Sequence, residues 1–274
     1  MFHTRITWLM LMFTASAVSA TPLATLTFLQ GQADLIRGTQ RYTLSEGVKL
    51  NATDIVSLKG NLVQIEMADG AIILLAPDTR IMLLPSRGKA PRLYLQQGAL
   101  KALTQHAISV NTANWELNLN NGAMAAHTQA MAAGAFLERG SLKLIPPKTV
   151  KAAAIELKSG EFYQTAAAES ERLLQRPTPA FIGALPRPFL DTPASRLLHF
   201  DKPVEPKPAG SFSYVDVAEW LTGPEAIRQM LLPTWRSKAS EPAFRAALQA
   251  NMSKHMEWDR IVNPQKYEKK PTHY

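Results

Sequence analysis

Apolar and polar residues alternate over many short stretches in the first two thirds of the chain. Clear examples are residues 33–36, 62–67 and 92–96, and glycines such as Gly98 mark the breaks between stretches. An alternation of period two is typical of strands that bury one face. The pattern therefore predicts a mainly β domain over residues 26–165.

The sequence also indicates how these strands are connected. Asp69-Gly70 separates the apolar stretches 63–67 and 72–75, which predicts a tight hairpin turn. Apolar pairs recur after glycine-marked corners with no long helical pattern between them. This favours a β-solenoid-like stack of short strands. A β sandwich or jelly roll has the same periodicity, so it stays open as the alternative.

Proline, alanine and arginine dominate residues 166–210. We expect a short helix over residues 166–175, followed by extended chain that the prolines keep semi-rigid. This Pro-rich connecting segment also carries many apolar residues, including Phe181, Phe189 and Phe200. We therefore expect it to lie along the β domain.

A small α-helical C-terminal module is predicted over residues 211–274. Ser213 can cap a first helix, and Gly223-Pro224 separates it from a second. A third helix begins near Pro242 and places Phe244 and Leu248 on one face. The module also contains three tryptophans, which we expect to be mainly core residues: Trp220, Trp235 and Trp258.

Residues 1–20 have the layout of a signal peptide. An early arginine, Arg5, precedes an apolar run over residues 6–18, and small residues lead to Ala20. Cleavage after Ala20 would make Thr21 the first residue of the mature chain. The alternative is an uncleaved membrane anchor, but the apolar run is shorter than the roughly 20 residues that a span requires. We expect export to the periplasm and no stable membrane span after cleavage.

Cysteine is absent from the whole sequence. This excludes disulfides, thiolate metal sites, cysteine nucleophiles and the lipidated cysteine of a bacterial lipoprotein. Lys and Arg exceed Asp and Glu by 30 to 22, but the excess is spread along the chain. Nucleic-acid binding would need a concentrated basic stripe. We therefore expect anionic or polar envelope partners and no nucleic acid.

The order of motifs in the β region resembles the FecR domain. The resemblance begins with residues 28–38, continues through Asp54-Ile55-Val56 and the Asp69-Gly70 turn, and reaches residues 93–100 and 157–160. It covers about half of the chain and implies a solenoid-like fold. The Val-Arg-Gly-Thr core of the family is not recognisable at residues 120–127.

The resemblance also bears on function. Membrane-spanning FecR regulators carry a cytoplasmic segment that contacts a sigma factor, followed by a transmembrane helix, and this sequence shows neither. It is therefore more similar to the exported FecR-like proteins. A signalling protein of a FecR-type transport regulation system is the alternative.

No catalytic motif is recognisable in the sequence. Ser195, His199 and Asp201 are close along the chain, but a proline-rich segment is a poor scaffold for a triad. His127 is a candidate ligand, although a lone histidine is more often structural. A polysaccharide-active solenoid enzyme would need clustered carboxylates. The β region offers these acidic residues: Asp34, Glu46, Asp54, Glu66, Asp69, Asp78, Glu116 and Glu138.

The sequence thus favours a non-catalytic periplasmic binding, scaffold or sensor protein that uses no cofactor or metal. Its partner would be a cell-envelope protein or glycan. Aromatic rings beside guanidinium groups are enriched at binding hot spots. Such pairs occur at Trp235-Arg236 and near Arg260, and we predict Trp235, Arg236 and Tyr267 as the partner-binding residues.

Overall fold

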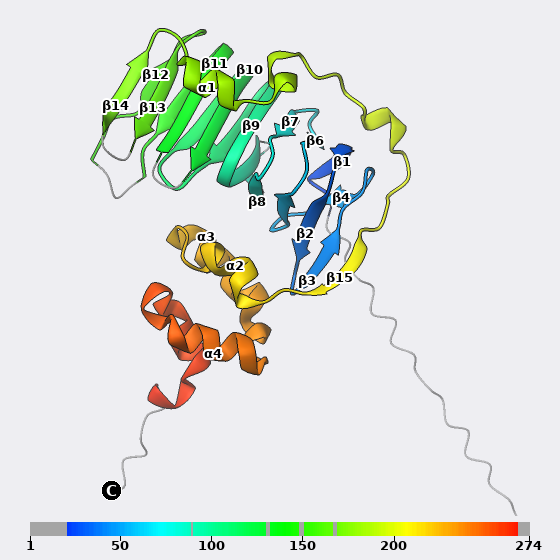
Figure 1. Ribbon diagram of the computed structural model, residues 1–274, viewed down its shortest axis with the longest axis vertical. Helices are drawn as coiled ribbons and strands as arrows, with labels where there is room; N and C mark the ends of the chain where they lie inside the picture. Colours follow the sequence, from blue (N-terminus) through cyan, green and yellow to red (C-terminus); the bar gives the residue numbers. More distant parts are fainter. Residues whose placement is uncertain (1–20, 89, 130–131, 148–150, 167–168, 268–274) are drawn as a thin grey trace, which may run out of the picture.

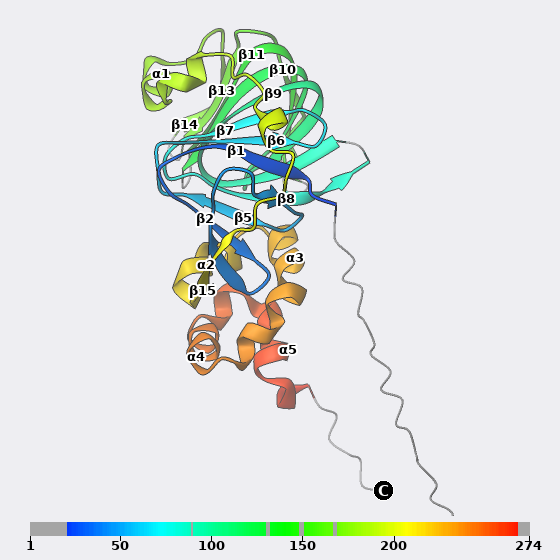
Figure 2. The ribbon, with the colours of Figure 1, turned by 90° about the vertical axis from the view of Figure 1, so that its right-hand side faces the viewer.

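The structure is a computed structural model that describes residues 21–88, 90–129, 132–147, 151–166 and 169–267. Its main feature is one antiparallel sheet of 15 strands that curls into a half-barrel, with helices of the C-terminal part packed below it (Figures 1 and 2). The coarse prediction of a mainly β chain with a helical C-terminal part is confirmed. A solenoid is not shown, because the named strands pair antiparallel in a continuous curled sheet.

The strands follow the predicted alternation closely in the first half of the chain. Their bounds are β1 Ala24–Gln30, β2 Ala33–Arg37, β3 Gln40–Thr43, β4 Lys49–Leu50, β5 Ile55–Leu58, β6 Leu62–Met67, β7 Ile72–Leu75, β8 Arg80–Arg87, β9 Ala90–Asn111, β10 Glu116–Gln129, β11 Ala132–Ile145, β12 Ile155–Leu157, β13 Phe162–Ala166, β14 Glu169–Leu174 and β15 Lys207–Ser211. The Asp69-Gly70 turn joins β6 to β7, as predicted.

The curl originates at β9, which is 22 residues long and has two sets of neighbours on one side. Its first part pairs with β8, and a later part pairs with β7. Gly98 lies between these parts with φ +90°, and a Cβ there would lie 2.5 Å from the Cα of Thr79. Only glycine fits so close an approach at a positive φ. The sheet therefore splits at Gly98 into two branches, β8-β5-β2-β3 and β7-β6-β1.

The inner face of the curled sheet holds the main core. Every second residue of the strands points inward, and nearly all of these side chains are fully buried. In β7, Ile73 and Leu75 face inward, whereas Ile72 and Leu74 face outward into a separate cluster. A strand that is apolar at every position is buried on both faces. The outer face of the sheet must therefore be covered as well.

The covering segments come from the second half of the chain. Helix α1, Pro179–Ala184, places Phe181 against Phe162, and the 3-10 helix η1, Arg187–Leu190, places Phe189 over the outer face of β6, β7 and β9. The chain then crosses the sheet, and its strand β15 pairs with β3 (Figure 1). The prediction that the Pro-rich segment lies along the β domain is confirmed. We call residues 186–206 the strap.

The C-terminal helices cover the outer face of the branch that contains β2, β5 and β8. They are the helices α2 Tyr214–Leu221, α3 Glu225–Trp235, α4 Pro242–Ala250 and α5 Asp259–Val262, and the 3-10 helices η3 Arg236–Ser240, η4 Met252–Lys254, η5 Met256–Trp258 and η6 Pro264–Lys266. Ser213 and Asp216 form a capping box, and Phe244 and Leu248 are buried, as the sequence predicts. The module packs on β2, β5, β8 and β9 in one cluster with Ile55 and Met82.

Two further expectations concern the ends of the Pro-rich and N-terminal segments. The prediction of a helix over residues 166–175 is wrong, because β14 occupies Glu169–Leu174 and pairs with β13 at the sheet edge. The signal peptide predicted over residues 1–20 lies outside the described residues. Among the described residues, the helices are too short or too polar to cross a bilayer.

Candidate functional site

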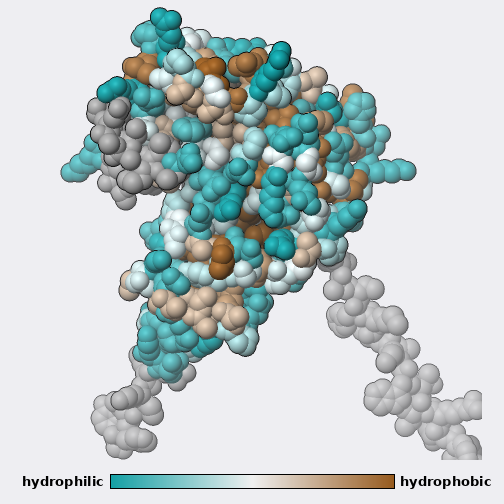
Figure 3. All heavy atoms as spheres, viewed as in Figure 1, coloured by the Kyte–Doolittle hydropathy of each residue, from teal (hydrophilic) through white to brown (hydrophobic). Residues whose placement is uncertain are grey.

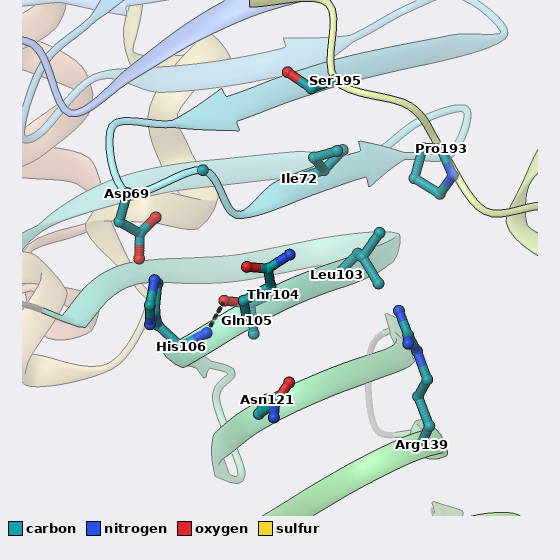
Figure 4. A pocket seen from close by; sticks show the side chains of 11 residues that line it. Asp69, Ile72, Leu103, Thr104, Gln105, His106, Asn121, Arg139, Pro193 and Ser195 are labelled. Atoms are coloured by element: carbon teal, nitrogen blue, oxygen red, sulfur yellow. Dashed lines mark hydrogen bonds between the residues drawn. The ribbon is translucent and has the colours of Figure 1, made fainter.

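A polar groove of about 760 Å³ opens between the Asp69-Gly70 turn, three neighbouring strands and the strap (Figure 4). Figure 4 shows Asp69 and His106 at one end of this groove and Arg139 at the other. The lining residues are Asp69, Gly70, Ile72, Leu103, Thr104, Gln105, His106, Asn121, Arg139, Pro193 and Ser195.

Two neighbouring β-bulges present side chains to the groove. Where β9 pairs with β10, Gln105 and His106 together oppose Asn121. Where β10 pairs with β11, Asn121 and Gly122 together oppose Gly140. A bulge bends its strand and re-aims a side chain, and bulges concentrate next to functional sites. The bulges therefore direct Gln105, His106 and Asn121 toward one opening.

Close backbone contacts fix the second bulge. A Cβ on Gly122 would lie 1.9 Å from the carbonyl oxygen of Arg139. A Cβ on Gly140 would lie 2.2 Å from the carbonyl oxygen of Asn121. Asn121 itself has φ +46°, a conformation that asparagine tolerates better than most residues. The two glycines thus hold Asn121 and Arg139 beside each other at the groove.

Local hydrogen bonds order the Asp69 end of the groove. The Asp69 carboxylate accepts a hydrogen bond from the backbone N–H of Ala71 at 3.1 Å, which stabilises the hairpin turn. The Thr104 hydroxyl accepts one from the backbone N–H of His106 at 3.0 Å (Figure 4). Both side chains are therefore engaged by local backbone, while His106 and Gln105 remain exposed.

The strap forms the opposite wall and is held by Glu66 of β6. The Glu66 carboxylate accepts hydrogen bonds from the Ser195 hydroxyl at 2.5 Å and the Arg196 backbone N–H at 2.7 Å. Gln64 donates to the Ala194 carbonyl at 3.0 Å. Burial alone would raise the pKa of Glu66, but these hydrogen bonds outweigh it and lower the pKa. Glu66 therefore clamps the strap as a carboxylate.

The groove is suited to hydrogen bonding with a polar ligand. Arg139 provides a planar fork of donors, Gln105 and Asn121 each provide a donor and an acceptor, and Asp69 provides negative charge. These side chains can bind hydroxyl, amide or carboxylate groups. Among the described residues that line the groove there is no Phe, Tyr or Trp ring for stacking.

The residues considered for catalysis do not come together. Ser195 is bonded to Glu66, and no hydrogen bond joins it to His199 or Asp201 within the described part of the chain. A carboxylate with a lowered pKa is a weak proton acceptor, so Glu66 is a poor general base. His127 lies beneath α1, 6.0 Å from the Phe181 ring, and burial lowers its pKa.

The acidic residues of the β region mostly serve the fold. Asp54 pairs with Arg37 at 2.6 Å, Asp34 with Lys59 at 2.7 Å, and Glu138 with Lys101 at 2.8 Å. Over the described ranges, no group of three or more His, Asp or Glu residues has a geometry that could hold a metal ion.

The predicted partner-binding residues have different environments. Trp235 is 1 % exposed, and its Nε1 donates to the Gly38 carbonyl at 3.0 Å, so its ring is a core side chain. This corrects its place among the contact residues. Arg236 is exposed, and Tyr267 is 49 % exposed. Their role in binding stays a prediction. Trp220 and Trp258 are buried, as expected.

The sequence alone does not indicate the groove. His106, Asn121 and Arg139 were not singled out, because they belong to three strands whose pairing the sequence does not reveal. One available signal was the two turn-like pairs, Asn121-Gly122 and Arg139-Gly140, inside otherwise strand-like stretches. A glycine inside a strand pattern suggests a bulge or a close backbone approach.

Comparisons with known proteins find weak structural similarity over part of the chain. No family model matches the chain, and no curated protein matches it. Two crystal structures of a "putative anti-sigma factor" from Parabacteroides distasonis ATCC 8503 are similar, at 13 % and 12 % identity and with TM-scores of 0.37 and 0.38. Each match covers 44 % of this chain and 57 % of that protein. The chain is thus similar over less than half its length to structures described as an anti-sigma factor.

Proposed function

We propose that this chain is a non-catalytic binding protein of the bacterial cell envelope and that the polar groove holds its partner. The observation that carries the proposal is the paired bulge, which gathers Gln105, His106, Asn121 and Arg139 at one opening. A bulge leaves one residue of the strand without its pairing partner, which weakens the sheet locally. A role in binding explains why two bulges occur together at this groove.

The partner that fits this groove is a polar surface group of a cell-envelope protein or glycan. The lining offers hydrogen-bond donors and acceptors on both sides, with Arg139 at one end and Asp69 at the other. The rigid walls, a bulged sheet and a clamped strap, favour a ligand that enters without rearrangement of the backbone.

The FecR-like assignment is part of the same proposal. The residues that carry the resemblance lie on β1, β2, β5, β6, β7 and β9, with the Asp69-Gly70 turn joining β6 to β7. A scaffold or sensor role follows from this assignment, with the periplasm as its location.

The location can be tested directly. N-terminal sequencing of the protein from a periplasmic extract should begin at Thr21. Recovery of the protein only in membranes, with the first residues retained, would contradict export with cleavage.

Site-specific crosslinking in cells tests the groove itself. A photo-crosslinking amino acid replaces the exposed Gln105, and the matched control carries it at Val215, which is 83 % exposed on α2. We expect an adduct at Gln105 and little at Val215. Partner peptides in the mass spectrum of the purified adduct would identify a protein partner, and a fall in the mass of the adduct on glycan hydrolysis would identify a glycan.

A second variant separates binding from chance collision. Arg139→Gln in the Gln105 crosslinking chain should reduce the adduct several-fold, because the fork of donors at the end of the groove is lost. Equal adducts at Gln105 and Val215, or an adduct unaffected by Arg139→Gln, would contradict the proposal.

A further inference from the structure

Three arginine side chains line one hollow in the C-terminal module, away from the polar groove. The hollow has a volume of about 570 Å³ and is lined by Arg236, Arg245 and Arg260, with Ser237 and Ser240 between them. The remaining lining residues are Pro233, Ala239, Ile261 and Pro264. We call this hollow the arginine pocket.

Different elements deliver the three guanidinium groups. Arg236 begins η3 directly after α3 and is exposed. Arg245 lies on α4, where its Nη2 donates to the Val262 carbonyl. Arg260 lies on α5, with its guanidinium 5.1 Å from the centre of the Tyr267 ring. Two of the three side chains are therefore held in place before any ligand binds.

Neighbouring carboxylates are engaged elsewhere. Glu241 accepts a hydrogen bond from the buried Lys238 Nζ at 2.5 Å. Asp259 accepts hydrogen bonds from Tyr267 at 2.7 Å and from Asn263 and Lys266, which together lower its pKa to about 2. No acidic side chain is among the described residues that line the pocket. The three positive charges thus face the hollow without a carboxylate partner in it.

From this arrangement we propose that the arginine pocket binds the phosphate group of a phosphate ester. Arginine forks match phosphate oxygens in pairs, and such charge-assisted bonds are stronger than neutral ones. A phosphate group offers more oxygens and more negative charge than a carboxylate, which suits three guanidinium groups and two hydroxyls. The ester could belong to a lipid headgroup or to a free metabolite.

The test uses the full mature chain and two defined probes. The first probe is glycerol 3-phosphate, whose binding is measured by titration calorimetry. The second is a vesicle of phosphatidylglycerol and phosphatidylcholine, whose binding is measured by co-sedimentation and compared with that of vesicles of phosphatidylcholine alone. Binding of vesicles alone assigns the site to a lipid headgroup, and binding of glycerol 3-phosphate alone assigns it to a free ester. Either result supports the phosphate site, provided that the variants below behave as expected.

The variants distinguish a site from general positive charge. Arg236→Gln should weaken binding at least tenfold, and the fold is expected to survive because Arg236 is exposed. Arg236→Lys keeps the charge but loses the fork, so its binding should be intermediate. The matched control is Arg187→Gln, an exposed arginine on η1, which should change binding less than twofold. Absence of binding to both probes, or equal weakening by Arg187→Gln, would overturn the proposal.

Discussion

At the scale of single residues, Gly140 combines a close backbone approach in the bulges with a positive φ. Its φ is +96°, and an added Cβ would lie 2.2 Å from the Asn121 carbonyl oxygen. Gly160 provides a comparison, because its φ is +91° and an added Cβ would meet nothing within 4 Å. The two positions separate the cost of the left-handed backbone from the cost of a clash.

We predict that Gly160→Ala lowers the free energy of unfolding by about 1–2 kcal/mol, the cost of a positive φ with a side chain. Gly140→Ala should lower it by at least about 2 kcal/mol more, because the backbone of β10 or β11 must shift. Urea unfolding at neutral pH measures both. Equal losses would mean that the bulge adapts and that its glycines do not fix the groove.

Glu66 supplies a prediction of pH dependence. Its pKa in the folded chain is lowered from 4.5, so its contribution to stability is present above that value and is lost as the pH falls toward the folded pKa. Glu66→Gln should cost about 1–3 kcal/mol at pH 7, because the Ser195 hydroxyl and the Arg196 backbone N–H lose a charged, buried acceptor. The variant should also lose less stability than the parent between pH 6 and pH 3. Parallel pH profiles would contradict the clamp.

Glu66 also shows where sequence reasoning stops at this scale. It falls at a polar position of an alternating strand, which predicts a solvent-facing carboxylate. The strap covers it instead, through contacts 129 and 130 residues away in the chain. An alternating pattern defines the two faces of a strand but does not show what covers the outer one.

At the scale of elements, the strap is attached to the sheet at several points. Phe189 is 1 % exposed against the outer face, and the Lys101 Nζ donates to the carbonyls of Phe189 at 2.6 Å and Asp191 at 3.1 Å. Further along, Lys49 donates to the Phe200 carbonyl at 3.2 Å. These contacts make the strap part of the folded sheet.

Phe189→Ala should therefore lower the free energy of unfolding by about 3–5 kcal/mol and make the strap sensitive to limited proteolysis. Its neighbour Leu190 is 65 % exposed, and Leu190→Ala should change stability by less than about 0.5 kcal/mol. If both variants resist protease like the parent, the strap is not held by Phe189.

Trp235 joins the module to the sheet. The centre of its ring lies 5.0 Å from the centre of the Phe212 ring. Its Nε1 donates a hydrogen bond to the Gly38 carbonyl, in the turn between β2 and β3. Trp235→Ala should lower the free energy of unfolding by about 3–5 kcal/mol, and Met256→Ala, at a side chain 74 % exposed, should change it little. Thermal unfolding measures both. A small effect at Trp235 would indicate that the module docks weakly.

The predicted elements correspond well to those observed where local signals are strong. The Asp69-Gly70 turn, the Ser213 cap and the Pro242 helix start are each specified by adjacent residues. The strand at residues 169–174 was missed because its sequence has no clear alternation and its pairing with β13 determines it. The sandwich and stacked-rung alternatives could not be separated, because strand periodicity does not specify which strands pair.

At the scale of the whole molecule, sheet and module share one hydrophobic cluster. Ile36, Ile55, Met82 and Leu84 of the sheet contact side chains of the module, and burial raises the pKa of Tyr94 to about 12. The ring of Tyr94 lies 5.9 Å from that of Trp220. Hydrophobic atoms, coloured brown, are scattered over the face shown in Figure 3 rather than gathered in one patch.

A chain that ends at Gly210 should therefore expose this apolar area of the sheet and associate with itself. We expect the full chain to sediment as a defined species and the shortened chain to form larger ones and bind a hydrophobic dye. The Tyr94 hydroxyl should then titrate nearer pH 10, its ordinary value. A shortened chain that stays monodisperse and binds no dye would show that the sheet does not need the module.

The contact between Trp235 and Gly38 also has a consequence for the order of biosynthesis. The two residues are 197 positions apart, so the strands that need the module emerge long before the helices that cover them. A chain interrupted before α3 would leave Ile55 and Met82 open to chaperones and proteases. This apolar surface is fully covered only when the chain has been synthesised as far as Val262, the last buried residue of the cluster. We therefore expect a truncated chain to be degraded faster in cells than the finished one.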